Sequence, residues 1–317
     1  MRRLVGLAVL LTLLAEGCGS SSSKPSVPTV TLALDFTPNA VHAPLFAAVD
    51  AGRDRARAVR LELRQPGSGP DALKLVGSGK AQLGVLDIHD LAIARAQGAD
   101  LVAVAALVQR PLAALAARPE VRRPRDLEGR TVGVSGLPSD PAFLKAIVER
   151  DGGDVSKVRQ VTIGFSAVTR ILSGRVDAAP VFWNAEGVAL RRRGVRTREF
   201  RVDDYGAPPY PEVVLVTSGE TLARERPALR RALLAIGDGI EAVRRDPQAA
   251  ARIVARAAEA QDTGLVRAQL DAVLPLFGLA LDFRHLEAWA AFDARIGIVA
   301  KRPDVAKAFV ALGKDPG

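Results

Sequence analysis

The stretch Leu34–Phe46, LDFTPNAVHAPLF, places an aspartate, an aromatic ring, an asparagine and a histidine close together. A carboxylate, an amide and an imidazole can hold the polar edge of a small molecule, while a phenyl ring stacks on its face. Pro38 should end a strand, and Asn39 should cap a helix whose first turn carries His42. Spacing alone leaves His42 equally able to be a buried, hydrogen-bonded histidine. The candidate ligand-binding residues here are Asp35, Phe36, Asn39 and His42.

Further candidates follow other predicted strands, in the segments LDIHD, SGLPSD and FWNAE. In the first of these, two aspartates bracket His89, but a metal ion would need a third or fourth ligand with supporting geometry. We therefore interpret these aspartates as helix caps, and we predict no metal, no cofactor and no catalytic residue. The segment Tyr205–Tyr210 adds both tyrosines of the chain. The candidate ligand-binding residues in these segments are Asp87, Ser135, Ser139, Trp183, Asn184, Glu186 and Tyr210.

Flat rings beside carboxylates and amides favour a planar, hydrogen-bonding small molecule as the ligand. The elements that must position these groups show a regular rhythm of β-rich runs and helical segments. This rhythm predicts an α/β fold with mostly parallel sheets, in which ligands bind beyond the carboxyl ends of the strands. From Glu220 onward the chain is nearly all helical, beginning with a helix from Pro227. The predicted strands are Val30–Leu34, Val59–Leu63, Gln82–Leu86, Leu101–Val108, Thr131–Ser135, Val158–Ile163, Ala178–Phe182 and Val213–Val216.

The pattern divides into two α/β cycles followed by helices, which predicts two lobes. We assign residues 29–107 with 213–317 to lobe I and residues 108–212 to lobe II. Crossings near Leu107–Leu115 and Pro211–Val216 would then form a hinge. Two hinged lobes suit closure over a ligand held in the cleft between them. We expect the protein to act as a monomer.

The formal net charge is +9, but the arginines are scattered among acidic residues rather than gathered in one stripe. The densest basic run, Arg191–Gly194, is typical of a solvated helix end. Nucleic acid is therefore not an expected partner. A single cysteine excludes an internal disulfide framework and argues against a zinc site built on thiolates.

The first residues predict export. Met1–Arg3 is basic, and the apolar run Leu4–Ala15 is shorter than the ~20 residues that span a bilayer. Cys18 follows Gly17, so this segment resembles a bacterial lipoprotein signal, although Leu14 lies one place from its usual position. We expect a signal peptide over residues 1–17, lipidation of Cys18, and a flexible tether over residues 18–28. The protein would then be anchored on the periplasmic or extracellular face of the membrane. The alternative is a cleaved secretory signal with an incidental cysteine.

Three strings together resemble a known family: LDFTPNAVHAPLF, GSGKAQLGVLDIHDLAIARAQGADLVAVAALVQRP and FWNAEGVALRRRG. They are similar to the NMT1/THI5-like substrate-binding proteins of ABC importers, and most to the branch that binds thiamine-precursor pyrimidines. The resemblance implies a type II periplasmic-binding-protein fold, a ligand between two lobes, and partnership with a permease and an ATPase. It assigns ligand contacts to positions in the first and third strings, with Phe36 where a tryptophan is more usual. By position these are Asp35, Phe36, Asn39, His42, Trp183, Asn184 and Glu186.

Three alternatives stay open. A binding protein for alkanesulfonate, nitrate or flavin shares the layout, but Asp35 and Glu186 count against an anionic ligand. The family also has a synthase branch that holds pyridoxal phosphate on a lysine. Here Leu86 and Asp90 stand where that lysine and its partner histidine are expected, which disfavours an enzyme. An exported sensory module is the third alternative.

Overall fold

The structure is a computed structural model and describes residues 27–67, 71–259 and 262–312. The predicted signal peptide, Cys18 and nearly all of the predicted tether lie outside the described residues. Within the described part of the chain, no helix combines the length and the apolar character needed to cross a membrane.

The first sheet has the strand order β2-β1-β3-β10-β4. The strand β4 occupies one end of this order, yet all its residues are buried. A bridge between Ala103 and Phe309 covers its outer edge, which explains why its sequence, LVAVAALV, is apolar on both faces. The strand β10 runs antiparallel to both of its neighbours. The bounds are β1 Thr29–Ala33, β2 Arg60–Arg64, β3 Leu83–Asp87, β4 Leu101–Val108 and β10 Val213–Ser218.

The second sheet has the order β7-β6-β8-β5-β9 and repeats this plan. The strand β5 is antiparallel to both β8 and β9, whereas β6 pairs in parallel with β7 and β8. In each sheet, the reversed strand is the one by which the chain enters from the other sheet. The bounds are β5 Ala113–Ala117, β6 Thr131–Val134, β7 Arg159–Thr162, β8 Ala178–Phe182 and β9 Arg198–Arg201.

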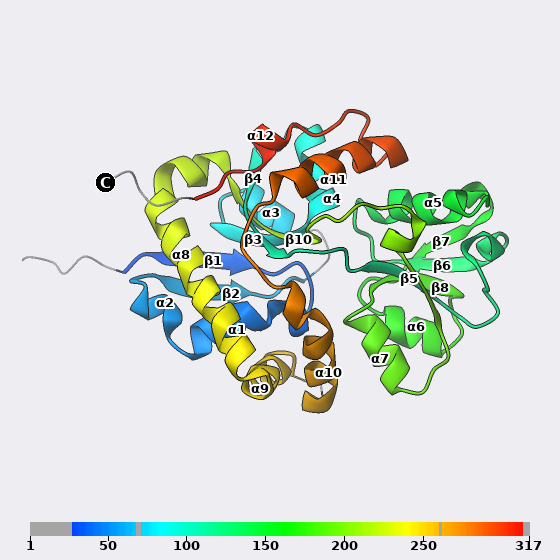
Figure 1. Ribbon diagram of the computed structural model, residues 1–317, viewed down its shortest axis with the longest axis horizontal. Helices are drawn as coiled ribbons and strands as arrows, with labels where there is room; N and C mark the ends of the chain where they lie inside the picture. Colours follow the sequence, from blue (N-terminus) through cyan, green and yellow to red (C-terminus); the bar gives the residue numbers. More distant parts are fainter. Residues whose placement is uncertain (1–26, 68–70, 260–261, 313–317) are drawn as a thin grey trace, which may run out of the picture.

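Helices cover both faces of each sheet, so the molecule consists of two three-layered lobes side by side (Figure 1). Around the first sheet lie α1 Ala43–Asp50, α2 Arg53–Ala56, α3 Asp71–Gly77, α4 Ile88–Ala96, α8 Gly219–Arg245, α9 Pro247–Ala257, α10 Thr263–Val273, α11 Phe283–Ile296 and α12 Val305–Ala308. Around the second lie α5 Asp140–Arg150, α6 Ala167–Leu172 and α7 Glu186–Arg192. Short 3-10 turns are Ala40–His42, Pro124–Leu127, Val155–Lys157, Val202–Tyr205 and Leu274–Leu276.

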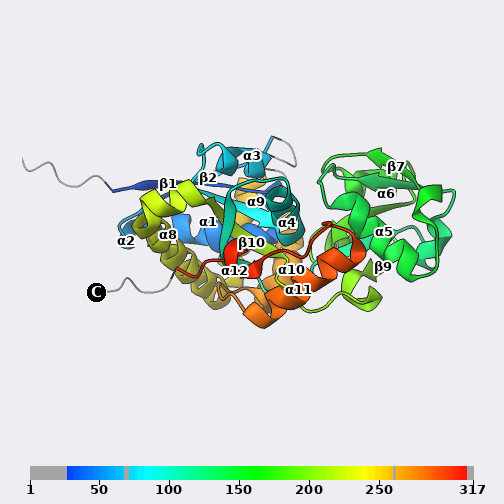
Figure 2. The ribbon, with the colours of Figure 1, turned by 90° about the horizontal axis from the view of Figure 1, so that it is seen from above.

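The helices of the C-terminal part return to the first sheet, and two of them reach the second lobe. The side-chain amide of Gln269 in α10 donates to the Ala185 carbonyl beside α7, at 3.1 Å. From above, α10 and α11 lie at the junction of the two lobes (Figure 2). The helical tail therefore supports the first sheet and also borders the space between the lobes.

The two crossings between the sheets lie against each other. One oxygen of Glu212, which precedes β10, accepts the backbone N–H groups of Leu112 and Ala113, which begin β5. The Trp183 backbone N–H donates to the Leu112 carbonyl at 3.0 Å, and the Trp183 indole N–H donates to the Pro111 carbonyl at 3.1 Å. Both connections are thus held in one hydrogen-bonded cluster.

The sequence did not predict β5 or β9. The β5 segment, AALAA, is made of residues that favour helices, and only its pairing with β8 and β9 makes it a strand. The helix α8 begins at Gly219 rather than at Pro227. Ser218 caps its first turn, and the helix is kinked at Glu225, because a proline two residues later disturbs the preceding backbone.

Candidate ligand-binding site

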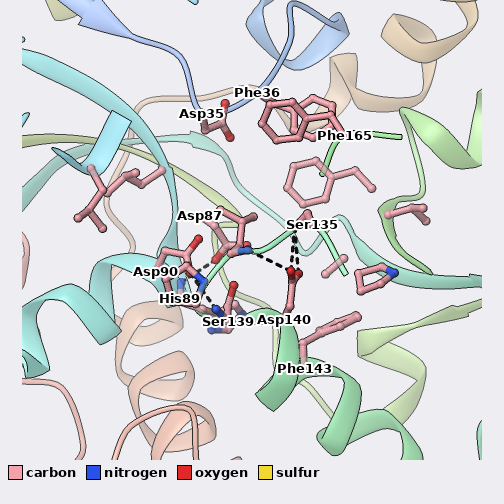
Figure 3. Close-up of a pocket in the computed structure, with 18 of the residues that line it drawn as sticks. Asp35, Phe36, Asp87, His89, Asp90, Ser135, Ser139, Asp140, Phe143 and Phe165 are labelled. Atoms are coloured by element: carbon pink, nitrogen blue, oxygen red, sulfur yellow. Dashed lines mark hydrogen bonds between the residues drawn. The ribbon is translucent and has the colours of Figure 1, made fainter. Parts of the chain in front are cut away.

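A cavity of about 180 Å³ lies between the two sheets. Its wall comes from the loops that follow β1, β3, β6, β7 and β8, which all lead from carboxyl ends of parallel strands (Figure 3). This is where open α/β sheets bind ligands. The volume is below the ~300–1,000 Å³ of sites for drug-sized molecules, so it suits a ligand of about one ring.

The loop after β1 forms a fixed hydrogen-bonded unit. The Asn39 side chain accepts the Val41 backbone N–H at 2.8 Å, and His42 Nδ1 accepts the Asn39 backbone N–H at 3.3 Å. A backbone amide can only donate, so Nδ1 carries the lone pair and Nε2 carries the proton. His42 Nε2 therefore donates to Asp35 Oδ1, at 2.8 Å.

This arrangement changes the predicted role of His42. Its side chain is 1% exposed and both ring nitrogens are occupied by protein groups. Although His42 borders the cavity, it has no nitrogen left to hold a ligand. It positions the carboxylate of Asp35 and leaves the second oxygen of that carboxylate available.

Aromatic rings from both lobes meet over the cavity. Phe36, after β1, and Phe165, after β7, have ring centroids 4.1 Å apart and planes inclined at 54°. Both rings line the cavity, together with Phe143 and Phe182. Phe165 was absent from our sequence-based candidates, although the rule that picks loops after strands would have found it next to Gly164.

The lobes also meet through a buried hydrogen bond. The Ser139 backbone N–H, before α5, donates to Asp90 Oδ1 in α4 at 3.1 Å. Asp140 turns back to accept the Ser135 hydroxyl and the N–H groups of Gly136 and Leu137. Burial raises the pKa of Asp90 and of Asp140. Two direct bridges between the lobes, one aromatic and one polar, show that the cleft is closed in this structure.

Glu186 brings a second carboxylate from the other lobe. One of its oxygens accepts the Phe182 backbone N–H at 3.1 Å. Burial raises its pKa, and the negative charge of Asp35 adds to this effect. Among the described residues that line the cavity, none is lysine or arginine. The site is therefore apolar in its walls and acidic at its rim.

Asp87, at the end of β3, and His89, in α4, join a buried polar cluster below the cavity. Asp87 accepts the His89 backbone N–H at 2.7 Å, and His89 Nδ1 lies 2.7 Å from Asp293 Oδ1 in α11. Burial raises the pKa of Asp87 to about 8 against the opposing charge of His89. Burial alone would lower the pKa of His89, but the carboxylates of Asp293 and Asp87 outweigh it and raise that pKa to about 10.

Three predicted site residues do not line the cavity. The Arg201 guanidinium carbon lies 4.4 Å from the centroid of the Trp183 ring. The Trp183 indole N–H donates to the Pro111 carbonyl in the crossing between the lobes. Asn184 is completely buried. Tyr210 is also completely buried, with its ring 4.9 Å from that of His89. Packing in the hinge and the core takes up these three side chains, so they lie outside the cavity lining.

The other predicted residues border the cavity. They are Asp35, Phe36, Asn39, His42, Asp87, Ser135, Ser139 and Glu186.

Comparison with known proteins gives the chain's relatives. A model of the family described as "NMT1/THI5 like" matches residues 39–250. A formylaminopyrimidine-binding protein of Halalkalibacterium halodurans is 33% identical over 227 residues, which cover 68% of this chain and 69% of that protein. A 4-amino-5-hydroxymethyl-2-methylpyrimidine phosphate synthase of Saccharomyces cerevisiae is 24% identical over 236 residues, covering 70% of this chain and 69% of that protein.

Solved structures share the fold at low sequence identity. The alkanesulfonate-binding protein SsuA of Xanthomonas axonopodis pv. citri superposes with a TM-score of 0.75 at 17% identity, covering 92% of this chain and all of that one. The aliphatic sulphonate-binding protein SsuA of Escherichia coli gives a TM-score of 0.74 at 15% identity, covering 93% of this chain and 95% of that one.

These superpositions confirm the expected periplasmic-binding-protein fold. The family model covers more than half of the chain, and the identity to a binding protein extends over two thirds of it. The loops that form the cavity lie largely within the matched segment. On these grounds the chain belongs to the NMT1/THI5-like family.

Proposed function

We propose that this protein is the substrate-binding component of an ABC importer and captures a small, unphosphorylated, amine-bearing heteroaromatic of the thiamine-precursor pyrimidine type. The observation that carries the proposal is the composition of the cavity, in which phenyl rings and carboxylates occur without a lysine or arginine among the described lining residues. The permease and ATPase would receive the ligand from the closed protein.

The acidic rim explains the choice of an amine. Asp35 uses one oxygen for the bond to His42 and has its second oxygen to offer. Glu186, which is held by the Phe182 N–H and by its own backbone N–H, brings a second carboxyl group to the cavity. Carboxylate oxygens accept from exocyclic amino and ring N–H groups, while Phe36 and Phe165 provide apolar ring surface. An aminopyrimidine presents both kinds of surface. The relative of Halalkalibacterium halodurans, which is named for formylaminopyrimidine, supports this ligand class.

The same rim disfavours anions. A sulfonate or a phosphate would meet the carboxyl groups of Asp35 and Glu186 in a partly desolvated cavity, with no described lysine or arginine in the wall. The fold shared with sulfonate-binding proteins therefore does not extend to their ligand. A synthase activity is disfavoured because Leu86 stands where the cofactor lysine is expected, and no lysine borders the cavity among the described residues.

Capture of the ligand would depend on the two lobes closing about the hinge. We infer that residues 29–107 with 213–317 close against residues 108–212, and that a monomer suffices because both cavity walls belong to one chain. Export and lipid anchoring through Cys18 complete the proposal and rest on the N-terminal sequence.

Isothermal titration with hydroxymethylpyrimidine and with formylaminopyrimidine tests the ligand class, with taurine and an alkanesulfonate as anionic competitors. We expect heat from at least one pyrimidine and none from the sulfonates. Heat only from a sulfonate, or from none of the four, refutes the proposed ligand class.

The variant Asp35→Asn tests the site itself. The asparagine oxygen can still accept from His42, so the loop stays intact while a charged acceptor is lost. We expect the pyrimidine Kd to rise about 10–100-fold, in line with the ~1.5–3 kcal/mol of a hydrogen bond to a charged group. The matched control is Asp50→Asn, an exposed acid paired with Arg256. An equal Kd in both variants would remove Asp35 from the site.

A further inference from the structure

The buried cluster below the cavity contains more carboxyl groups than basic side chains. Asp87, Glu212 and Asp293 surround the single imidazole of His89, and Glu212 and Asp293 are fully buried. Buried charges are costly unless a counter-charge balances them. Asp87, His89 and Glu212 each offer one ligand atom, and these atoms lie within 4.8 Å of one another.

Each of the three side chains is held through one atom by a hydrogen bond within the protein. Asp87 Oδ1 accepts the His89 backbone N–H. Glu212 Oε2 accepts the Leu112 and Ala113 N–H groups. His89 Nδ1 faces Asp293, and the Trp289 indole N–H lies 3.2 Å from the same nitrogen.

No N–H or hydroxyl group in the described part of the chain donates to Glu212 Oε1, which is buried. The carboxyl groups of Asp87 and Glu212 lie close enough to share a proton, and a bound cation would replace that proton. No hydrogen bond among the described residues engages His89 Nε2. A histidine with one nitrogen on a carboxylate and the other nitrogen available is the usual arrangement of a metal-binding imidazole.

A second observation also indicates a missing partner. The hydroxyl of Tyr210 is completely buried, and no described group bonds to it. Its ring stands edge-on to that of His89, with 4.9 Å between the centroids. Buried polar atoms are normally satisfied, so several unpartnered oxygens around one imidazole point to an absent ion or water.

From this geometry we propose that Asp87, His89 and Glu212 form a divalent cation site between the hinge and the ligand cavity. One imidazole nitrogen with two carboxylate oxygens suits Zn²⁺, Mn²⁺ or a related ion. Side-chain movements of about 1 Å bring such atoms to the ~2.0–2.2 Å of a zinc bond. Asp87 and His89 also line the cavity, so the ion faces the space where a ligand sits.

From the sequence we predict no metal here, because Asp87 and His89 have no third ligand nearby in the chain. The fold supplies Glu212, which is brought to β3 by the antiparallel pairing of β10. Asp293 acts as a positioning residue, because it holds the imidazole from behind. This site does not depend on the proposed organic ligand.

The full chain is first dialysed against a chelator and then titrated with Zn²⁺ alone by calorimetry. We expect one ion per chain, and at least tenfold weaker binding in His89→Gln and in Glu212→Gln. Glutamine at position 212 can still accept the Leu112 and Ala113 amides, so the crossing is retained. Asp293→Asn should weaken binding by about 10–100-fold. The matched control is His285→Gln, which removes an exposed histidine 3.7 Å from Asp282.

A spectroscopic measurement on the wild-type protein tests the site without any substitution. X-ray absorption of the zinc-loaded protein should show one imidazole nitrogen among oxygen neighbours. Three results overturn the site: no stoichiometric binding, binding that disappears in His285→Gln but not in Glu212→Gln, or a zinc shell without a histidine. In each case protons alone balance the cluster.

Discussion

A substitution in α8 tests how closely the helices behind the site must approach. A Cβ added at Gly239 would lie 2.1 Å from the Pro44 carbonyl oxygen and 3.1 Å from the Cβ of Ala48, both in α1. Because the nearest atom belongs to the backbone, α1 must move by about 1 Å. At Gly237, two residues earlier, the nearest atom is a Leu279 methyl at 3.5 Å. Gly237→Ala is therefore a matched control in the same helix.

The two substitutions should have opposite effects. Replacing a helical glycine by alanine stabilises by about 0.5–1 kcal/mol, which is what we expect for Gly237→Ala. For Gly239→Ala, overpacking of about 1–3 kcal/mol set against this gain leaves a net loss of up to about 2.5 kcal/mol. A loss of about 1–2 kcal/mol lowers the Tm by about 2–8 °C.

The assay is thermal unfolding followed by circular dichroism, with pyrimidine titrations alongside it. Since α1 directly follows the loop that carries Asn39 and His42, its displacement should also weaken pyrimidine binding. The reasoning is refuted if Gly239→Ala is as stable as Gly237→Ala.

Two further outcomes follow from contacts described above, and a third follows from the ion pair of Arg123 and Asp151. Phe165→Ala removes one ring of the pair at 4.1 Å and should raise the pyrimidine Kd by about 5–20-fold in calorimetry; an unchanged Kd in a folded variant would take Phe165 out of the site. Trp183→Phe loses the hydrogen bond to the Pro111 carbonyl, so it should lower the Tm while the pyrimidine Kd changes less than about threefold. A larger change in Kd would show that the indole contacts the ligand. The Arg123 guanidinium beside Asp151 lowers the pKa of that carboxyl below 3.8. The pair therefore contributes its full stability above the ordinary carboxyl pKa and loses it as the pH falls through the lowered pKa. Asp151→Asn should reduce the free energy of unfolding at pH 7 by no more than ~1 kcal/mol, and this difference should shrink as the pH falls through the lowered pKa.

Much of the fold could be predicted because apolar periodicity reports burial directly. The bounds of β4 and β8 match the prediction to the residue. The segments that the prediction missed, β5 and β9, have no such signal. Their strand state comes from pairing with residues distant in the sequence, which local propensity does not encode.

The candidate site was likewise predictable in part from the sequence. Loops after parallel strands were recognisable, so Asp35, Ser139 and Glu186 were found from position alone. Side-chain direction was not recognisable. Trp183 follows a strand, like its neighbour Glu186, yet it turns into the crossing between the lobes. Likewise, whether His42 faces a ligand or a carboxylate depends on one backbone N–H, that of Asn39.

The ring pair of Phe36 and Phe165 has a kinetic consequence. Because the rings come from opposite lobes and touch at the cavity, their contact would hinder the exit of a captured molecule. Its residence time would then depend on how often the lobes part, as well as on its own bonds. A membrane partner that separates the lobes would thereby control the release of the ligand, whatever the affinity of the closed form.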